Sequence, residues 1–224
     1  MDFPDMLASS IHDIKNSLGV VSNNLAILIG DPETKFSDPQ RACLLQHEVQ
    51  RVNNNLIQLL NLYKLGENAL MLDICEHQVE DLLEEVVVNN EAICKSLGVT
   101  LDYGCDPELS GYFDLELLRG VLESTIGNAQ RYATSRIHLD AKYKDDYLVI
   151  QVEDDGAGFP PELLKVTGIG HHMIQMLNVS GRTRLGLLFA EKISRLHRTK
   201  ERTGFIRIEN GCTLGGGCFQ IWLP

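Results

Sequence analysis

A histidine and a carboxylate stand side by side near the start of the chain, at His12 and Asp13. An imidazole can accept and release groups near neutral pH, and an adjacent carboxylate can hold one ring nitrogen protonated while the other attacks. His12 lies beside the apolar positions of a helical pattern and not among them. We therefore expect its side chain to point into solvent from a rigid helix, where two partners can reach it in turn. Because acid-flanked surface histidines are common, the pair alone is only a hypothesis.

The helix that carries His12 has an apolar residue at alternate steps of four and three, the spacing of a coiled-coil seam. These residues are Leu7, Ile11, Ile14, Leu18, Val21, Leu25 and Leu28. The helix is expected to end near residues 30–32 (GDP), and a second seam follows after about residue 39. Its members are Leu45, Val49, Val52, Leu56, Leu59 and Tyr63. Residues 1–66 therefore predict an antiparallel helical hairpin that dimerises into a four-helix bundle, because two helices alone bury both stripes poorly.

After Gly66 the pattern changes to alternating strands and helices. Strands are expected at 70–75, 100–103, 136–143, 147–153, 205–209 and 218–223, and helices at 79–97, 114–133 and 185–197. This order predicts an α+β fold for residues 67–224, in which a mixed sheet carries helices on one face.

Composition narrows the function classes. The 224 residues suit one or two domains, and 44% hydrophobic residues suffice for a core. The longest apolar runs fall far short of the ~20 residues that span a bilayer, and no basic signal-peptide start is present, so a cytoplasmic protein with no membrane partner is expected. A formal net charge of −11 argues against a nucleic-acid partner. Six scattered cysteines without a CxxC pair suggest neither a disulfide framework nor a zinc site.

Four segments, in the correct order, resemble the sequence boxes of the bacterial two-component sensor histidine kinases. They are residues 12–18 (HDIKNSL, the H-box), 122–132 (LESTIGNAQRY, the N-box), 152–160 (VEDDGAGFP, the first glycine box) and 182–187 (RTRLGL, the second glycine box). The resemblance covers nearly the whole chain. It implies a dimerisation and histidine phosphotransfer domain at 1–66 and an ATP-binding catalytic domain at 67–224, folded as the two-layer α/β sandwich of the histidine-kinase ATPase type.

The resemblance also implies ATP and Mg²⁺ as cofactors and assigns roles in the pocket. Asn128 would coordinate Mg²⁺ through its amide oxygen. Asp154 would accept a hydrogen bond from the exocyclic amine of adenine, with Gly156 and Gly158 allowing close approach. Arg131 would neutralise phosphate charge, although a plain ion pair on the helix surface is the alternative. The remaining candidates from the boxes are Tyr132, Thr183, Gly186 and Leu187.

The chain departs from the family pattern at four positions. Ser124 replaces the first N-box asparagine, and Ser17 replaces a common proline, which removes a helix kink. Arg182 and Arg184 replace glycines of the second glycine box. Their side chains could block the approach of phosphate to a helix N-terminus, or add charge-assisted contacts to it, and the sequence leaves both open.

The implied function is a histidine kinase that phosphorylates itself on His12 from ATP and passes the phosphoryl group to an aspartate of a response-regulator receiver. Asp13 would orient and deprotonate the imidazole, and Asn16 would orient a water for a phosphatase reaction. A homodimer is expected, with a separate sensor protein supplying the signal. The main alternative is a phosphotransferase that relays phosphate between receivers without ATP. A kinase-like regulatory binding protein is a third, less supported class.

Overall fold

The computed structural model describes residues 3–31, 34, 36, 39–67, 70–164 and 185–224, without the side chains of residues 3–9, 12, 39, 40 and 43. The chain divides into two compact units, Met1–Met71 and Leu72–Pro224. Among the described helices, none combines the length and the apolar character that a membrane crossing requires.

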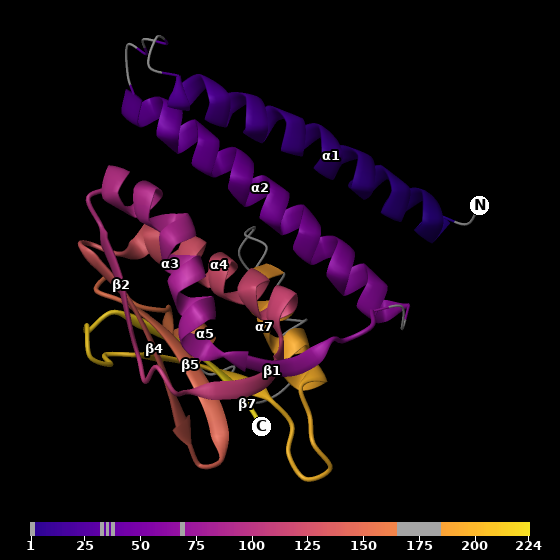
Figure 1. Cartoon of the computed structure of the whole chain (residues 1–224), viewed down its shortest axis with the longest axis vertical. Coiled ribbons are helices and arrows are strands. Elements are labelled where there is room, and N and C mark those ends of the chain that lie inside the picture. Colours follow the sequence, from indigo (N-terminus) through magenta and orange to yellow (C-terminus); the bar gives the residue numbers. More distant parts are fainter. Residues whose placement is uncertain (1–2, 32–33, 35, 37–38, 68–69, 165–184) are drawn as a thin grey trace. The chain divides into compact units, whose positions relative to one another are not determined.

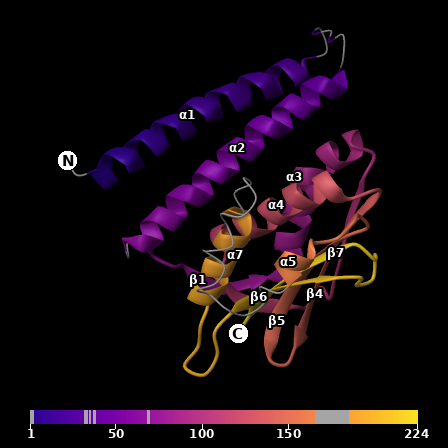
Figure 2. The same ribbon diagram turned by 180° about the vertical axis from the view of Figure 1, so that it is seen from behind.

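The first unit is a hairpin of two long helices, α1 (Phe3–Gly30) and α2 (Pro39–Gly66). They lie side by side, as Figures 1 and 2 show. Helix α1 continues without interruption through Ser17, whose hydroxyl donates to the backbone carbonyl of Asp13 at 3.0 Å. A proline at this position would have no such donor and would lack the backbone N–H that the helix uses. The two predicted helices are therefore present, with the expected ends.

The apolar seam of each helix consists of two rows, and within each row the residues repeat every seven positions. On α1, Ile11 is buried, and Leu18 and Leu25 are half-buried. The alternate row of α1 and the matching row of α2 are between 39% and 56% exposed. We call this set the open stripe: Ile14, Val21, Leu28, Leu45, Val52 and Leu59. One hairpin thus covers only half of its own seam.

The second unit is a two-layer α/β sandwich, which confirms the predicted fold of this part (Figures 1 and 2). Its elements are β1 (Ile74–Gln78), α3 (Val79–Ser96), β2 (Thr100–Cys105), β3 (Ser110–Asp114), α4 (Leu115–Tyr132), β4 (Arg136–Lys144), β5 (Tyr147–Asp154), α5 (Pro161–Leu164), α7 (Leu185–Leu196), β6 (Phe205–Asn210) and β7 (Gly217–Leu223). The main sheet has the order β2-β4-β5-β7-β6, with β2 and β4 parallel and the other pairs antiparallel. Strands β1 and β3 form a separate antiparallel pair.

Helices α3, α4 and α7 cover one face of the main sheet. Along β5, alternate residues such as Ile150 and Val152 face these helices and are buried. On α4, buried residues recur every three or four positions, as in Leu118, Leu122 and Ile126. Because strand side chains alternate between faces, Asp154 lies on the helix side of β5 and Glu153 on the other.

One predicted strand was misplaced, and one strand was missed. The first strand covers residues 74–78 and not 70–75, and Ser110–Asp114 is a strand that the sequence reading missed. Both strands belong to the small sheet, where most residues of β1 are exposed. In β3 the buried positions include Gly111 and Asp114, so neither short strand shows the alternation of apolar and polar residues on which strand prediction depends.

A buried histidine joins the end of α7 to the start of α4. His197 is 2% exposed. Its Nδ1 donates to the carbonyl of Ile193 at 2.9 Å, and its Nε2 accepts from the backbone N–H of Asp114 at 3.0 Å. This pattern requires the neutral ring, and burial lowers the pKa of His197 despite the nearby Ile193 carbonyl and Asp114. Asp114 in turn caps α4 by accepting from the N–H of Leu117 at 3.0 Å.

Candidate functional site

Asp154 occupies the last position of β5 and is 8% exposed. Its Oδ1 accepts from the backbone N–H of Gly156 at 2.8 Å and from that of Gly217 at 3.3 Å. No donor among the described residues is recorded for Oδ2. One oxygen is therefore fixed by the backbone, and the other remains for a ligand that donates a hydrogen bond.

Glycines surround this carboxylate because no side chain would fit. A Cβ on Gly156 would lie 2.0 Å from the carbonyl oxygen of Tyr132, and one on Gly216 would lie 2.4 Å from the carbonyl oxygen of Asp154. A Cβ on Gly217 would lie 2.8 Å from Oδ2 of Asp154. Gly216 and Gly217 were missed at the sequence level, although the run Gly215-Gly216-Gly217 before the last strand was a visible signal. Together these glycines form a cradle around Asp154.

The second glycine of the first glycine box holds the loop against β6. Gly158 has φ +78°, a conformation that favours glycine, and a Cβ there would lie 2.7 Å from Cγ of Asn210. The amide of Asn210 pairs with the backbone of Phe159 in both directions, accepting at 2.7 Å and donating at 2.8 Å. The close approaches at Gly156 and Gly158 are therefore to protein atoms, so these glycines shape the loop.

Asp155, the residue after Asp154, has a separate structural role that the sequence analysis missed. Asp155 accepts from three consecutive backbone N–H groups, of Thr134, Ser135 and Arg136, at 2.8 to 3.1 Å, and from the Ser135 hydroxyl at 2.6 Å. Desolvation opposes ionisation, but the bonds from Ser135, Arg136 and Thr134 outweigh it and lower the pKa of Asp155. This carboxylate therefore clamps the first glycine box to the turn that follows the N-box helix.

Helix α4 presents its candidate side chains at the surface. Asn128, Arg131 and Tyr132 are all exposed on its last turns. No ion pair of the described residues includes Arg131, so the alternative of a plain surface ion pair has no support in this part of the chain.

The start of α7 meets the N-box helix at Gly186. A Cβ there would lie 2.5 Å from Oγ of Ser124 and 3.6 Å from Nδ2 of Asn128. Residue 124 is the position where the family has asparagine, and the small serine lies directly against the second glycine box. Gly186 thus approaches the candidate metal ligand, and Leu187 beside it is half-buried. Thr183, Arg182 and Arg184 lie outside the described residues.

The donor set fits ATP and Mg²⁺. The cradle leaves one oxygen of a nearly buried carboxylate for an amine, and an exposed amide oxygen at Asn128 is a hard ligand of the kind Mg²⁺ accepts. Residue 12 lies in α1, but its side chain is outside the description. The adjacent Asp13 and Asn16 are exposed on the same helix.

Comparison with known proteins identifies the second unit. Residues 113–224 match the model of the histidine kinase-, DNA gyrase B- and HSP90-like ATPases. The chain is 24% identical over 154 residues to the virulence sensor histidine kinase PhoQ of Salmonella typhimurium, covering 69% of this chain and 31% of that protein. It is 26% identical over 224 residues to the sensor histidine kinase CpxA of Escherichia coli K12, covering 98% of this chain and 46% of that protein. The chain thus spans less than half the length of these relatives.

Solved structures share the fold. The Acinetobacter baumannii histidine kinase AdeS superimposes with a TM-score of 0.61 at 17% identity, covering 95% of this chain and 96% of that one. Full-length ShkA in complex with AMPPNP gives a TM-score of 0.65 at 21% identity, covering 99% of this chain and 46% of that one. The resemblance to sensor histidine kinases that the four boxes predicted is confirmed, and the chain belongs to the family of histidine kinase-, DNA gyrase B- and HSP90-like ATPases.

Proposed function

We propose that this chain is an ATP-dependent histidine kinase that transfers the γ-phosphoryl group of ATP to His12. The observation that carries the proposal is the cradle around Asp154, in a domain of an ATPase family, on a chain that also has a His-Asp pair on an exposed helix. The reaction breaks the bond between the γ-phosphorus and the β,γ-bridging oxygen and forms a bond from that phosphorus to an imidazole nitrogen of His12.

The cradle provides a basis for choosing adenine. The free Oδ2 of Asp154 would accept from the exocyclic amine of adenine, whereas guanine presents a carbonyl oxygen at that position. Two acceptors facing each other without a shared proton leave a desolvated polar group without a partner, which typically costs about 1–3 kcal/mol. Asp154 therefore acts as the specificity group for the base.

The phosphate end of the nucleotide would lie along α4 and the start of α7. Asn128 would hold Mg²⁺, which supplies charge neutralisation at the phosphates. Arg131 is exposed one turn further along and would add a charge-assisted contact. Gly186 keeps the first turn of α7 close to Asn128 without a side chain between them. Tyr132 and Leu187 flank this region, and Thr183 precedes it in sequence.

On the hairpin, His12 would be the phosphoryl acceptor and Asp13 the group that takes its proton and orients the ring. Asn16 lies one helical turn after His12, on the same side of α1, and would orient a water that attacks the phosphohistidine in a phosphatase reaction. The phosphohistidine would otherwise pass its phosphoryl group to an aspartate of a response-regulator receiver, with a separate sensor protein controlling the balance.

The open stripe supports a homodimer. It places six large apolar side chains in line on the two helices, where a single hairpin leaves them exposed. A second hairpin with the same stripe would cover them in a four-helix bundle with two-fold symmetry. Full burial of an aliphatic side chain contributes roughly 1.5–3 kcal/mol, and about half of that remains to be gained by side chains that are 39% to 56% exposed, so six from each copy favour association.

The test is incubation of the purified protein with Mg²⁺ and ATP labelled in the γ-phosphate. We expect protein-bound label that acid removes, as for phosphohistidine, and that His12→Ala abolishes. His47→Ala is the matched control, because His47 lies on the other helix of the same hairpin and should leave labelling intact.

Absence of label in the wild-type protein would contradict the kinase. If the same protein then takes label on His12 from a phosphorylated receiver, the phosphotransferase alternative replaces it.

A further inference from the structure

The face of the main sheet opposite Asp154 carries a cluster of three metal-binding side chains. Glu153 of β5 and Cys218 of β7 are direct partners across the two strands. Cys212 lies in the loop between β6 and β7. One carboxylate oxygen of Glu153 and the two sulfur atoms all lie within 4.8 Å of one another. The spacing of the cysteines along the chain gave no indication of this cluster, because Cys218 meets Glu153 only through the pairing of β5 with β7.

We propose that Cys212, Cys218 and Glu153 form a binding site for a thiophilic divalent cation, with Zn²⁺ as the best match. Two thiolates and one carboxylate are a ligand set that Zn²⁺ takes in tetrahedral sites, with bonds of about 2.3 Å to sulfur and 2.0–2.2 Å to oxygen. Ligand atoms around such an ion lie roughly 3–4 Å apart. The observed cluster needs only a small contraction to reach that geometry.

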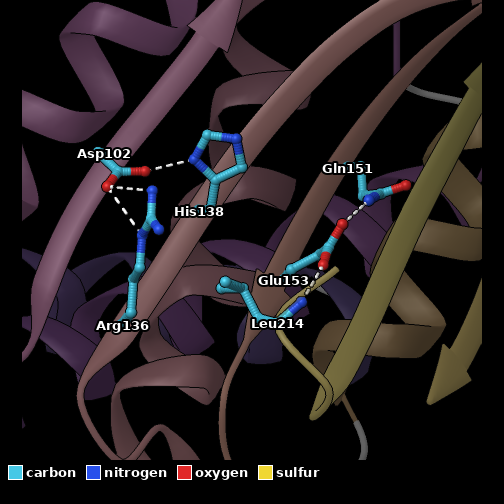
Figure 3. A network of polar contacts seen from close by, with 6 residues as sticks. All are labelled: Asp102, Arg136, His138, Gln151, Glu153 and Leu214. Atoms are coloured by element: carbon cyan, nitrogen blue, oxygen red, sulfur yellow. Dashed lines mark hydrogen bonds and ion pairs between the residues drawn. The ribbon is translucent and has the colours of Figure 1, made fainter. Parts of the chain in front are cut away.

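The surrounding groups already orient these ligands. Glu153 is 2% exposed, and it accepts from the backbone N–H of Leu214 at 3.1 Å and from the side-chain amide of Gln151, as Figure 3 shows. Cys218 is fully buried, and its sulfur accepts from the side-chain amide of Gln220 at 3.7 Å. Hydrogen bonds to ligand atoms are the supporting contacts that characterise built metal sites. Because these bonds already fix the side chains of Glu153 and Cys218, metal binding would require less loss of side-chain freedom.

The charge balance of the cluster favours a cation. Glu153 accepts hydrogen bonds from neutral donors only, and no ion pair of the described residues includes it. The ammonium group of Lys142, which pairs with Asp140 at 2.7 Å, acts on Glu153 and Cys218 only through space. Glu153 is 2% exposed, and a divalent ion would compensate the charge of this buried carboxylate and of the two bound thiolates.

The fourth position has a candidate as well. Oε2 of Glu209 lies 4.0 Å from the sulfur of Cys212. Glu209 also pairs with Arg207 at 3.0 Å and is about half exposed, so it can be replaced by water. His138, the cross-strand neighbour of Glu153, is not part of the cluster. Its Nδ1 bonds to Asp102 (Figure 3), and its Nε2 lies beside Gly104 of β2, 3.7 Å from a Cβ placed there.

Binding has a fixed proton balance. Two neutral thiols become metal-bound thiolates, so up to two protons leave to the solvent for each ion bound. Affinity should therefore rise with pH. No oxidant is needed, in contrast to a disulfide between the same two residues.

The test uses the whole protein, freed of metal by a chelator and kept reduced with a phosphine, without nucleotide. Zn²⁺ is titrated against a chromogenic chelator, and Co²⁺ is used as a second probe because thiolate ligands give it an intense charge-transfer band. We expect one equivalent of tight binding with that band. Cys212→Ser and Cys218→Ser should each weaken binding by more than about 10-fold, since even supporting contacts contribute that much. Cys75→Ser is the matched control, because Cys75 is exposed and outside the cluster.

Equal binding by the wild-type protein and the two cysteine variants, or no band with Co²⁺, would overturn the site. Because Cys218 is buried, its variant is checked for folding through the fluorescence of Trp222, the single tryptophan. Glu153→Gln keeps an acceptor for the Leu214 N–H and removes only the charge. If it binds Zn²⁺ as tightly as the wild type, the carboxylate is not a ligand and the proposal fails.

Discussion

Replacing Gly156 by alanine should destabilise the second unit, so that it unfolds at a lower denaturant concentration. The new Cβ would lie 2.0 Å from the carbonyl oxygen of Tyr132, more than about 1 Å short of ordinary contact. That oxygen is backbone at the end of α4, so no side-chain rotation can relieve the clash. The loop must move, and overpacking of this kind costs about 1–3 kcal/mol.

The same movement weakens the bond from the Gly156 N–H to Asp154 at 2.8 Å. A hydrogen bond to a charged group contributes about 1.5–3 kcal/mol, so the two costs together should be about 2.5–6 kcal/mol where the bond is lost. With a urea dependence of about 1–3 kcal/mol per molar, the midpoint should fall by about 1 M or more. The assay is urea unfolding followed through Trp222, which lies in β7 of the same unit.

The matched control is Gly127→Ala. Gly127 is inside α4, and nothing lies within 4 Å of a Cβ placed there. Alanine in a helix interior is better than glycine by up to about 1 kcal/mol, so this variant should unfold at a higher urea concentration. If Gly156→Ala unfolds at the same midpoint as the wild type or above it, the crowded cradle is refuted.

Three further outcomes follow from the described contacts. The free energy of unfolding should fall as the pH drops below about 6.5, because a histidine in the unfolded chain then takes up a proton that buried His197 does not. In urea titrations between about pH 7 and pH 5, this fall should be weaker for His197→Gln than for the wild type. Equal falls in the two proteins would contradict the buried neutral histidine. Asp155→Asn should lower the free energy of unfolding by about 1 kcal/mol or more at neutral pH. In thermal unfolding, its difference from the wild type should shrink as the pH falls below about 4, because the bonds that lower the pKa of Asp155 favour the ionised form. A difference independent of pH would argue against the role of this carboxylate. If the proposed homodimer forms through the open stripe, Val52→Glu should give a monomer in sedimentation equilibrium, whereas Val88→Glu, exposed on α3, should leave the dimer intact. A Val52 variant as dimeric as the wild type would contradict the role of the open stripe.

Long periodic elements were readable from the sequence, and short exposed ones were not. The helix at residues 114–133 and the hairpin at 136–153 carried strong apolar patterns, and both agree with α4, β4 and β5. The strand Ser110–Asp114 has only five residues and pairs with a largely exposed partner, so its pattern was too weak to read. Its buried positions, Gly111, Phe113 and Asp114, include a glycine and a charged residue, so burial left no apolar alternation in the sequence.

The sequence predicted only those residues of the site that lie within one continuous motif. The boxes located Asp154, Gly156 and Asn128, since each lies within one short segment. The contribution of Gly217 depends on pairing between β5 and β7, which brings together residues 63 positions apart. The same pairing joins Cys218 to Glu153, which no spacing of cysteines along the chain could indicate.

The hydrogen bonds of Asp155 also determine where this domain can tolerate an insertion. Residues 133–135 look like a tolerant surface turn, since they are short, polar and mostly exposed. Three successive amides starting at Thr134 are nevertheless held by one carboxylate, so their spacing must match it. An inserted residue or tag there would pull the end of α4 away from the loop of Gly156. The hairpin tip at Asp145-Asp146, at the opposite end of β4 and β5, has the ion pair of Asp146 with Arg202 at 2.6 Å but no carboxylate that holds successive amides, so it is the better place for a label or a fused domain.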